Sequence, residues 1–173
     1  HVVIWEWLLD FPTSSYCTFD EALEKNEKLI LKYKDSDFVQ VSVSPHSIYT
    51  VSSENLVKAK ELARKYNSIY HIHVSETQKE FDDCLSTNNM TPIQYLDDLW
   101  VLDNKSVLAH CVYLWEKDFD ILKNRWVHVS HCPLSNLKLW SWISPIKKML
   151  EYWINVTLWT DGSASSNRLD IWE

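Results

Sequence analysis

Residues able to bind a metal ion or transfer protons stand near the ends of several hydrophobic runs. In the run SIYHIHVS (68–75), His71 and His73 lie two residues apart, and Glu76 follows three residues after His73. Because side chains two apart on a strand face the same side, the two imidazoles would share one face of this strand. Later runs contribute further candidates, namely His110, His128, His131 and Asp161. A single histidine is more often a structural core residue, but this recurrence favours one shared site.

Imidazole nitrogens and carboxylate oxygens are typical ligands of zinc and other borderline divalent ions. Such an ion lowers the pKa of a bound water to about 7 and so supplies hydroxide at neutral pH. An Asp beside the ion can take up the water proton, while a second His and a Glu can polarise and protonate the group under attack. Catalytic zinc usually has about three protein ligands. The two that this pattern offers are too few, so we expect a further ligand upstream.

The candidates belong to a sequence in which β-rich runs alternate with amphipathic segments. Six runs predict strands, at 2–7, 38–44, 68–75, 106–112, 126–132 and 154–160. Apolar residues at helical spacing predict helices at 18–33, 53–66, 91–99, 116–124 and 146–152. Thr18 and Ser53 are plausible N-caps. This alternation predicts a parallel sheet covered on both faces, which an open doubly wound sheet and a closed barrel satisfy equally. Active sites of both lie at the carboxyl ends of the strands.

Composition excludes several functional classes. The chain has 173 residues, 46% of them hydrophobic, and a net charge of -7 with its 17 basic residues scattered, so nucleic acid is not an expected partner. No apolar run approaches the roughly 20 residues of a membrane-spanning helix, and no signal peptide pattern opens the chain. The four cysteines lie far apart without CxxC spacing, which predicts reduced thiols. We therefore expect a soluble, cytoplasmic protein, in one domain without a linker, although 77–92 is a longer polar stretch.

Five strings, in order along the chain, carry a resemblance to a known family. They are PHSIYT (45–50), HIHVSET (71–77), AHCVYL (109–114), SHCPLSNLKL (130–139) and TDGSASSNRLD (160–170). Essentially from end to end, the chain resembles the metal-dependent amidohydrolases related to S-adenosylhomocysteine and methylthioadenosine deaminases and to triazine chlorohydrolases. Five motifs in the right order are far more specific than any one of them.

The resemblance implies a role for individual residues. His73 would be a ligand of Zn2+ or of another divalent ion such as Fe2+, and Asp161 would be both ligand and base. Glu76 would protonate a ring nitrogen, and His110 would orient the water and the tetrahedral adduct. The substrate would contact His46, in a string where Ile48 replaces a usual proline.

Other polar residues in these strings have weaker claims. His131 and Asn136 would face the substrate or support the residues that do. We interpret His71 and His128 as structural.

The same resemblance implies a (β/α)8 barrel, of which residues 1–173 would be a partial domain with about strands three to eight. The first strand of this family contributes a His-x-His pair of metal ligands, and His1 stands alone at the start of the chain. We therefore expect a domain truncated at both ends and inactive as an isolated fragment. The expected partner is a small, purine nucleoside-like substrate, and a homo-oligomer is left open.

The function that follows is metal-dependent hydrolysis of a non-peptide C–N bond, with deamination of an adenosine derivative. Aminohydrolases of triazines, guanine or cytosine and chlorohydrolases share the scaffold and are the first alternative, because a fold does not fix a function. A non-catalytic barrel homologue is the second. A doubly wound domain that binds a phosphorylated ligand is a third, although it lacks the Gly-rich loop that such a site needs.

The count of glycine is abnormal, with one glycine against ten tryptophans. Tryptophan stands where similar sequences have glycine, as in LWVL (99–102) and LWTDG (158–162), and such positions often require a positive φ that an indole resists. We hypothesise that UGA codons read as glycine in the source organism are printed as tryptophan. The positions concerned are Trp5, Trp7, Trp100, Trp126, Trp140, Trp142, Trp153 and Trp159.

Overall fold

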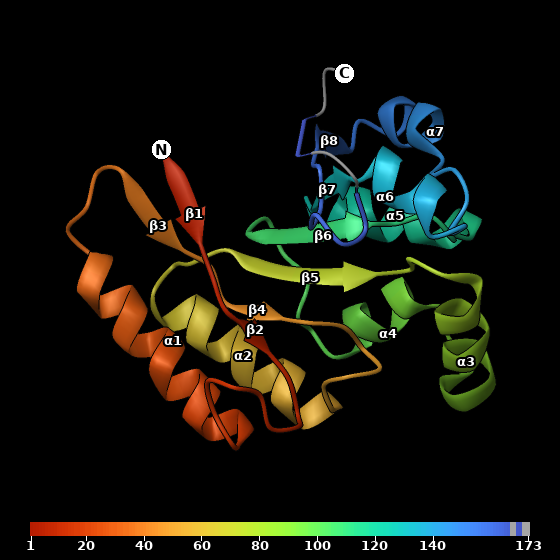
Figure 1. Ribbon diagram of the computed structural model, residues 1–173. Helices are drawn as coiled ribbons and strands as arrows, with labels where there is room; N and C mark the ends of the chain where they lie inside the picture. The colour runs from red at the N-terminus through yellow and green to blue at the C-terminus, as the bar shows by residue number, and fades with distance from the viewer. Residues whose placement is uncertain (167–168, 171–173) are drawn as a thin grey trace. The chain divides into compact units, whose positions relative to one another are not determined.

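A computed structural model describes residues 1–166 and 169–170 (Figure 1). Asn167 and Arg168 of the last motif lie outside the described residues, as does Trp172. The chain divides into two compact units, His1–Ile72 and His73–Glu173. In the described part of the chain, no helix combines the length and apolar character needed to cross a membrane.

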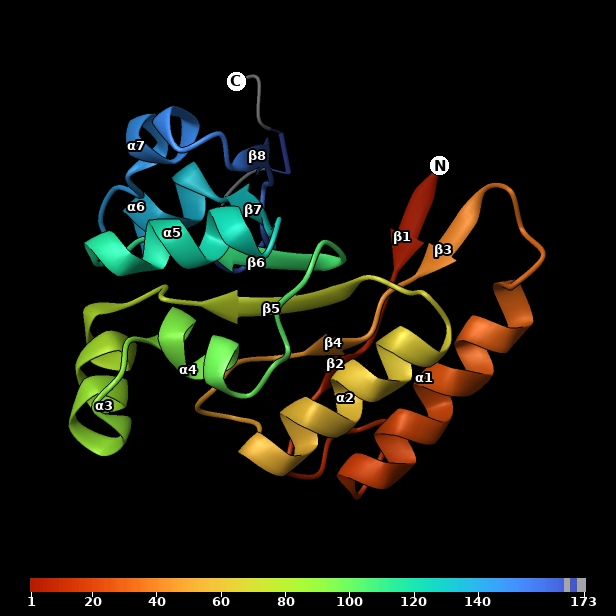
Figure 2. The same cartoon turned by 180° about the vertical axis from the view of Figure 1, so that it is seen from behind.

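The first unit has four short strands and two helices. Its elements are β1 (Val2–Ile4), β2 (Trp7–Leu8), α1 (Phe19–Tyr33), β3 (Val39–Val41), β4 (Ser44–Pro45) and α2 (Ser53–Lys65). Strand β1 pairs in parallel with β3, and β2 pairs in parallel with β4. Figures 1 and 2 show α1 and α2 side by side along these strands. The two strands expected at 2–7 and 38–44 are therefore present, but each is interrupted.

The second of these segments also pairs on its other side, at Val43. The Val43 N–H donates to the carbonyl of Ile69 (2.8 Å), and its carbonyl accepts from the N–H of His71 (3.0 Å). One residue earlier, the N–H of Ser42 still donates to the carbonyl of Ile4 (3.1 Å). The segment is therefore paired on both sides: Val43 bridges to Tyr70, while β3 and β4 keep one register with β1 and β2.

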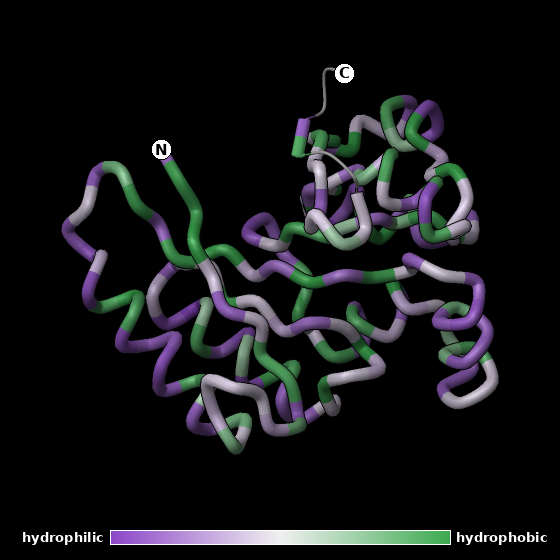
Figure 3. The backbone as a smooth tube through the Cα atoms, in the orientation of Figure 1, coloured by the Kyte–Doolittle hydropathy of each residue, from purple (hydrophilic) through white to green (hydrophobic). Residues whose placement is uncertain are grey.

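Helix α1 illustrates how the local sequence specifies an element. The Thr18 hydroxyl accepts a hydrogen bond from the Glu21 N–H (3.2 Å), and the Glu21 carboxylate accepts one from the Cys17 N–H (2.7 Å). These contacts satisfy backbone donors at the start of the helix. Its buried face includes Phe19 and Ile30, and Figure 3 shows hydrophobic and hydrophilic segments alternating along the helix. The predicted N-cap Thr18 is confirmed.

Four strands form a sheet with the order β5-β6-β7-β8. The division between the two units falls within β5, and β6, β7 and β8 belong to the second unit. The strands of this sheet are β5 (Tyr70–Val74), β6 (Ser106–His110), β7 (His128–His131) and β8 (Asn155–Leu158). The helices between them are α3 (Gln78–Asn88), α4 (Pro92–Asp98), α5 (Glu116–Asn124), α6 (Pro133–Lys138) and α7 (Ile146–Glu151). Strands β6, β7 and β8 pair in parallel, with Leu108 beside Val129 and Val129 beside Val156. Both Leu108 and Val129 are fully buried, as expected of a strand covered on both faces.

Two helices and one cap differ from the sequence-based expectation. The polar stretch 77–92 contains helix α3, whose N-cap Thr77 accepts from the Glu80 N–H (3.1 Å). Helix α6 begins with Pro133 directly after β7. The prediction of Ser53 as an N-cap is wrong, because α2 has Ser52 at that position without a side-chain cap. The Asp10 carboxylate instead accepts from the Ser52 N–H (2.8 Å).

A buried carboxylate joins α4 to α5. Asp118 is fully buried and accepts from the Thr91 hydroxyl (2.6 Å), the Gln94 amide (3.3 Å) and the Trp115 N–H (2.7 Å). Thr91 is the N-cap of α4, and Trp115 is the N-cap of α5. Asp118 therefore fixes the starts of two helices at once.

We predict that Asp118→Ala in the full-length protein lowers the free energy of unfolding by about 2–4 kcal/mol, because it leaves the buried Thr91 hydroxyl without its acceptor. Urea denaturation measures this change. Asp120→Ala, at an exposed position of the same helix, is the matched control and should change stability by less than about 0.5 kcal/mol. Equal effects of the two substitutions would contradict the assigned role of Asp118.

Candidate active site

The second unit carries ionisable side chains at the carboxyl ends of neighbouring strands. His73 lies in β5, His110 is the last residue of β6, and His131 is the last residue of β7. Glu76 follows β5, and Asp161 follows β8. Because β6, β7 and β8 are parallel neighbours, their carboxyl ends meet at one edge of the sheet.

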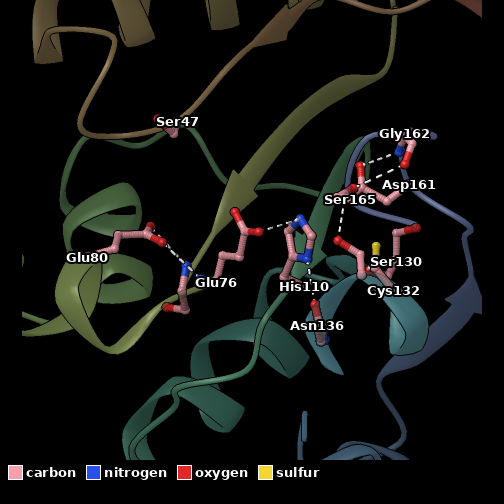
Figure 4. A network of polar contacts seen from close by, with 12 residues as sticks. Ser47, Glu76, Glu80, His110, Ser130, Cys132, Asn136, Asp161, Gly162 and Ser165 are labelled. Carbon is pink, nitrogen blue, oxygen red and sulfur yellow. Dashed lines mark hydrogen bonds and ion pairs between the residues drawn. The ribbon is translucent and has the colours of Figure 1, made fainter. Parts of the chain in front are cut away.

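Glu76, His110 and Asn136 form a line of polar contacts (Figure 4). The Glu76 Oε1 atom lies 3.8 Å from His110 Nε2, and His110 Nδ1 lies 2.8 Å from Asn136 Oδ1. An amide oxygen only accepts hydrogen bonds, so Nδ1 of His110 carries a proton and donates it to Asn136. His110 and Asn136 are each 1% exposed. The imidazole is therefore held in one tautomer, with Nε2 directed toward Glu76.

His73 contacts the same group of residues. Its ring lies 5.4 Å from the His110 ring, centroid to centroid, and 6.2 Å from the Trp159 ring, with which it is stacked at 19°. His73 is buried within β5. The structure thus brings His73, His110 and Glu76 together, and Trp159 covers one side of His73.

Asp161 is held by hydrogen bonds from three groups. The hydroxyls of Ser135 (2.6 Å) and Ser165 (2.7 Å) donate to its Oδ2 atom, and the N–H of Gly162 donates to Oδ1 (2.8 Å). Burial raises the pKa of this carboxyl, but the hydrogen bonds from Ser135, Ser165 and Gly162 outweigh it, and the pKa is lowered. Asp161 is therefore ionised at neutral pH and fixed in orientation.

Glu76 shifts in the opposite direction. Burial raises its pKa, the charge of Asp161 raises it further, and His110 acts against both. The two carboxyl groups thus differ in proton affinity: Glu76 holds a proton more tightly than an ordinary glutamic acid, and Asp161 loses its proton more readily than an ordinary aspartic acid. Such a divergence is typical of acid–base pairs in enzymes.

A second glutamate, which the sequence analysis did not single out, holds the segment after β5. Glu80 is buried, and its carboxylate accepts from the N–H groups of Ser75 (2.9 Å) and Glu76 (2.8 Å). Burial raises the pKa of Glu80 to about 7, although these backbone donors favour the charged form. The spacing Thr77-x-x-Glu80 is a capping-box pattern that could have identified it. Ser135 and Ser165 were also missed, and no local pattern links them to Asp161.

Four residues at these strand ends have a left-handed backbone. Ser75 (φ 52°), His110 (φ 73°), Cys111 (φ 46°) and Asp161 (φ 61°) all have left-handed conformations. The Cys111 N–H donates to the Val74 carbonyl (3.1 Å), which holds the end of β6 against the end of β5. Non-glycine residues in this region cost about 1–3 kcal/mol each and cluster at functional sites. The strain is therefore consistent with a site that needs fixed side-chain directions.

The remaining candidates lie in different surroundings. His131 has its Nδ1 atom buried without a hydrogen-bond partner among the described residues. His46 belongs to the first unit, where its Nδ1 atom contacts the Ser47 (3.2 Å) and Thr50 (3.0 Å) hydroxyls. Burial lowers the pKa of both histidines, and the charge of His110 lowers that of His131 further. Their substrate contacts stay predictions.

The two histidines interpreted as structural also have defined neighbours. His71 lies against the rings of Trp5 and Trp7, each 5.5 Å from its own ring. His128 accepts from the Asn155 amide at Nδ1 (3.0 Å), and its Nε2 atom contacts the Asn104 carbonyl (3.3 Å). Neither contact set involves the line from Glu76 to Asn136.

The donor atoms of the site fit part of a metal centre. His73 offers an imidazole nitrogen and Asp161 a carboxylate that is itself hydrogen-bonded, as ligating carboxylates commonly are. Zinc and iron accept both donor types. Within the described ranges, no three His, Cys, Asp or Glu side chains form a group that could hold an ion. A bound ion would therefore need ligands in addition to these two.

Parallel strands that alternate with helices and carry ionisable side chains at their carboxyl ends are the arrangement of (β/α)8-barrel enzymes. The Amidohydrolase family matches residues 3–173. The chain belongs to this family, and its fold is a partial (β/α)8 barrel, as the sequence predicts.

Two curated relatives are each 44% identical to the chain. One is a 5'-deoxyadenosine deaminase of Methanothrix thermoacetophila, aligned over 88% of this chain and 37% of that protein. The other is a 5-methylthioadenosine/S-adenosylhomocysteine deaminase of Thermodesulfovibrio yellowstonii, aligned over 99% of this chain and 39% of that protein. The chain thus spans less than half the length of these relatives.

Solved structures show the same likeness. An adenosine deaminase from Xanthomonas campestris with bound zinc is 30% identical and superimposes with a TM-score of 0.94, over 98% of this chain and 38% of that one. A guanine deaminase from C. acetobutylicum with bound guanine is 28% identical, with a TM-score of 0.83 over 93% and 40% of the two chains. The fold is therefore shared with enzymes that act on different purines.

The raised pKa of Glu80 predicts a pH-dependent contribution to stability. A carboxyl whose pKa rises from 4.5 to about 7 on folding stabilises the fold in full below about pH 4.5 and loses that contribution as the pH rises through about 7. Glu80→Gln keeps a neutral side chain at every pH. As the pH rises from about 4.5 to above 7, the free energy of unfolding of the variant should therefore increase relative to that of the parent protein by about 3 kcal/mol.

Denaturation of the full-length protein and its Glu80→Gln variant across this pH range measures the effect. Gln78→Ala, an exposed neutral position on the same helix, controls for general effects on α3. A stability difference between Glu80→Gln and the parent that is independent of pH would refute the raised pKa.

Proposed function

We propose that a full-length protein containing this chain deaminates an adenosine derivative by hydrolysis, with 5'-deoxyadenosine, methylthioadenosine or S-adenosylhomocysteine as the substrate type. The observation that carries the proposal is the arrangement of Glu76, His110 and Asp161: Glu76 lies 3.8 Å from His110 Nε2, and Ser135 and Ser165 hold Asp161. The pKa of Glu76 is raised and that of Asp161 is lowered, in agreement with this arrangement. The names of the two relatives at 44% identity support the substrate class.

The proposed metal ligands of this chain are His73 and Asp161, completed by ligands outside it. A bound Zn2+ or Fe2+ ion would lower the pKa of a water molecule to about 7. Asp161, held as an anion by Ser135 and Ser165, would accept a proton from the water that attacks the amino-bearing ring carbon.

Glu76 supplies a proton to the ring nitrogen next to the attacked carbon. Its raised pKa keeps a larger fraction of this carboxyl protonated near neutral pH than an ordinary glutamic acid. The proton held by Asp161 then passes to the amino group, the C–N bond breaks and ammonia leaves. Transfer of the hydroxyl proton back to the Glu76 carboxylate leaves the ring nitrogen protonated, gives the oxo product and balances the reaction.

His110 directs its Nε2 atom toward Glu76, and in the neutral ring this atom has a free lone pair. Because Nδ1 donates to Asn136, Nε2 accepts a hydrogen bond from the attacking water or from the hydroxyl of the adduct. We assign Asn136 as a positioning residue, because it acts through His110. His46 and His131 are proposed to contact the substrate. The four free cysteines suit a cytoplasmic location.

Ammonia release tests the proposed function directly. We predict that the full-length protein, loaded with Zn2+, releases ammonia from at least one of 5'-deoxyadenosine, methylthioadenosine and S-adenosylhomocysteine. Glu76→Gln should lower kcat by about 10²–10⁴-fold, because it removes the proton donor. Asp83→Asn, exposed on α3, is the control and should leave kcat unchanged. Release from guanine or a triazine alone would replace the substrate class, and no release from any substrate would support a non-catalytic homologue.

The role of Asn136 predicts a change in a pH profile. Asn136→Ala should lower kcat/KM by about 10–100-fold, because the imidazole of His110 is no longer held in one tautomer. Asn136→Asp places an anion beside Nδ1 and should restore part of the activity while shifting the pH dependence of kcat/KM governed by His110 to higher pH. A loss of activity without any shift in Asn136→Asp would indicate a structural role only.

A further inference from the structure

Four tryptophans share one backbone conformation at one kind of position. Trp100, Trp126, Trp140 and Trp153 have φ values of 58°, 58°, 58° and 62°. Each tryptophan directly follows the C-cap residue of a helix. The helices are α4, α5, α6 and α7, in that order. Four consecutive helices of the second unit therefore end in the same way, on a left-handed tryptophan.

The hydrogen bonds at these four ends follow one pattern. The N–H of Trp100 donates to the Asp97 carbonyl (2.9 Å), and the N–H of Val101 donates to the Leu96 carbonyl (3.2 Å). This pair is the Schellman motif, in which the left-handed residue is usually glycine.

The other three helices repeat the same pair of bonds. They are Trp126 to Lys123 (3.1 Å) with Val127 to Leu122 (3.0 Å), Trp140 to Leu137 (3.3 Å) with Ser141 to Asn136 (2.8 Å), and Trp153 to Leu150 (3.0 Å) with Ile154 to Met149 (3.0 Å). The apolar contact that accompanies the motif is also available, because Val101, Val127 and Ile154 are buried beside their helices.

Tryptophan is poorly suited to this position. A Cβ atom makes the left-handed conformation unfavourable, whereas glycine adopts it without that penalty. Burial of the indole offsets little of this cost, since Trp126 is 76% exposed and Trp140 and Trp153 are each 89% exposed. Trp100 is 68% exposed, with the Arg125 guanidinium 5.1 Å from its ring centroid. The backbone at these positions therefore has the conformation of glycine, and the side chains gain little burial.

Helix α2 shows what an ordinary sequence places at such an end. Asn67 (φ 51°) follows its C-cap, and the N–H groups of Asn67 and Ser68 donate to the carbonyls of Arg64 (3.2 Å) and Ala63 (2.8 Å). Asparagine is the usual second choice to glycine in this conformation.

We propose that Trp100, Trp126, Trp140 and Trp153 are glycines in the protein as its own organism makes it, encoded by UGA codons that this organism reads as glycine. UGA differs from the tryptophan codon UGG only in its third base. Translation with a genetic code in which UGA means tryptophan would place Trp at each such codon. Trp142 (φ 84°, 69% exposed) has the same left-handed backbone in a loop and is included in the proposal. The chain would then have six glycines instead of one among its 173 residues, closer to the usual share of about 7%.

A glycine at some of these positions would also change the candidate active site, whatever reaction it carries out. Trp5, Trp7 and Trp159 have no left-handed φ, so only the resemblance to glycine-containing strings places them in the same group. At position 159, glycine would remove the indole that stacks on His73. The stacking ring would then be no part of the substrate pocket.

Coding DNA and the native polypeptide give the direct test. The gene should carry TGA at codons 100, 126, 140, 142 and 153, and peptides from the source organism should have the mass of glycine at these positions. TGG codons there, or peptides with the mass of tryptophan, would overturn the proposal.

Stability gives an independent test of the strain. The full-length protein with Trp100, Trp126, Trp140 and Trp153 all changed to glycine should have a Tm higher by about 5 °C or more than the protein as printed. Trp115→Gly is the control, because Trp115 has an ordinary φ of -93° and its ring lies 5.7 Å from that of Phe81. It should not raise Tm. An unchanged or lower Tm of the fourfold variant would contradict the assignment.

Discussion

The parallel pairing of β6, β7 and β8 is the constraint on which the site depends. Pairing of Ala109 with Ser130 and of His131 with Leu158 fixes how far each strand extends toward one edge of the sheet. His110, His131 and Asp161 therefore emerge at neighbouring places although up to 51 positions separate them in the sequence. A one-residue slip of any strand would turn its side chains to the other face and dissolve this cluster.

Electrostatics then gives each group of the site a distinct character. Glu76 and Asp161 are both carboxyls, yet burial dominates the first and hydrogen bonds dominate the second, so their pKa values move apart. The His110 ring lies 3.8 Å from Glu76 at Nε2, and its Nδ1 atom donates to Asn136 of α6. Helix α6 thus contributes to the site together with the strand ends, because its Asn136 and Ser135 side chains orient His110 and Asp161.

Residues with a left-handed backbone occur both at the ends of strands and after the C-caps of helices, and their surroundings differ. At the strand ends, His110, Cys111 and Asp161 are buried or partly buried and held by hydrogen bonds, so the fold can maintain their strain for a function. At the helix ends, the tryptophans are 68% to 89% exposed, so their side chains gain little burial from the strained backbone. The same backbone angle therefore indicates a functional constraint in one place and a wrongly assigned residue in the other.

The sequence by itself determined the six strand regions, the five helices other than α3 and α6, and the strand-end positions of the reactive residues. It also showed the excess of tryptophan over glycine. These are local properties, since period, capping residues and motif order need no distant partner. Only the tertiary structure decided that Asn136 holds His110, that Glu80 holds the segment bearing Glu76, and that Ser135 and Ser165 hold Asp161. The physical reason is that hydrogen bonds and burial depend on distances between segments far apart in the chain, which spacing along the sequence does not specify.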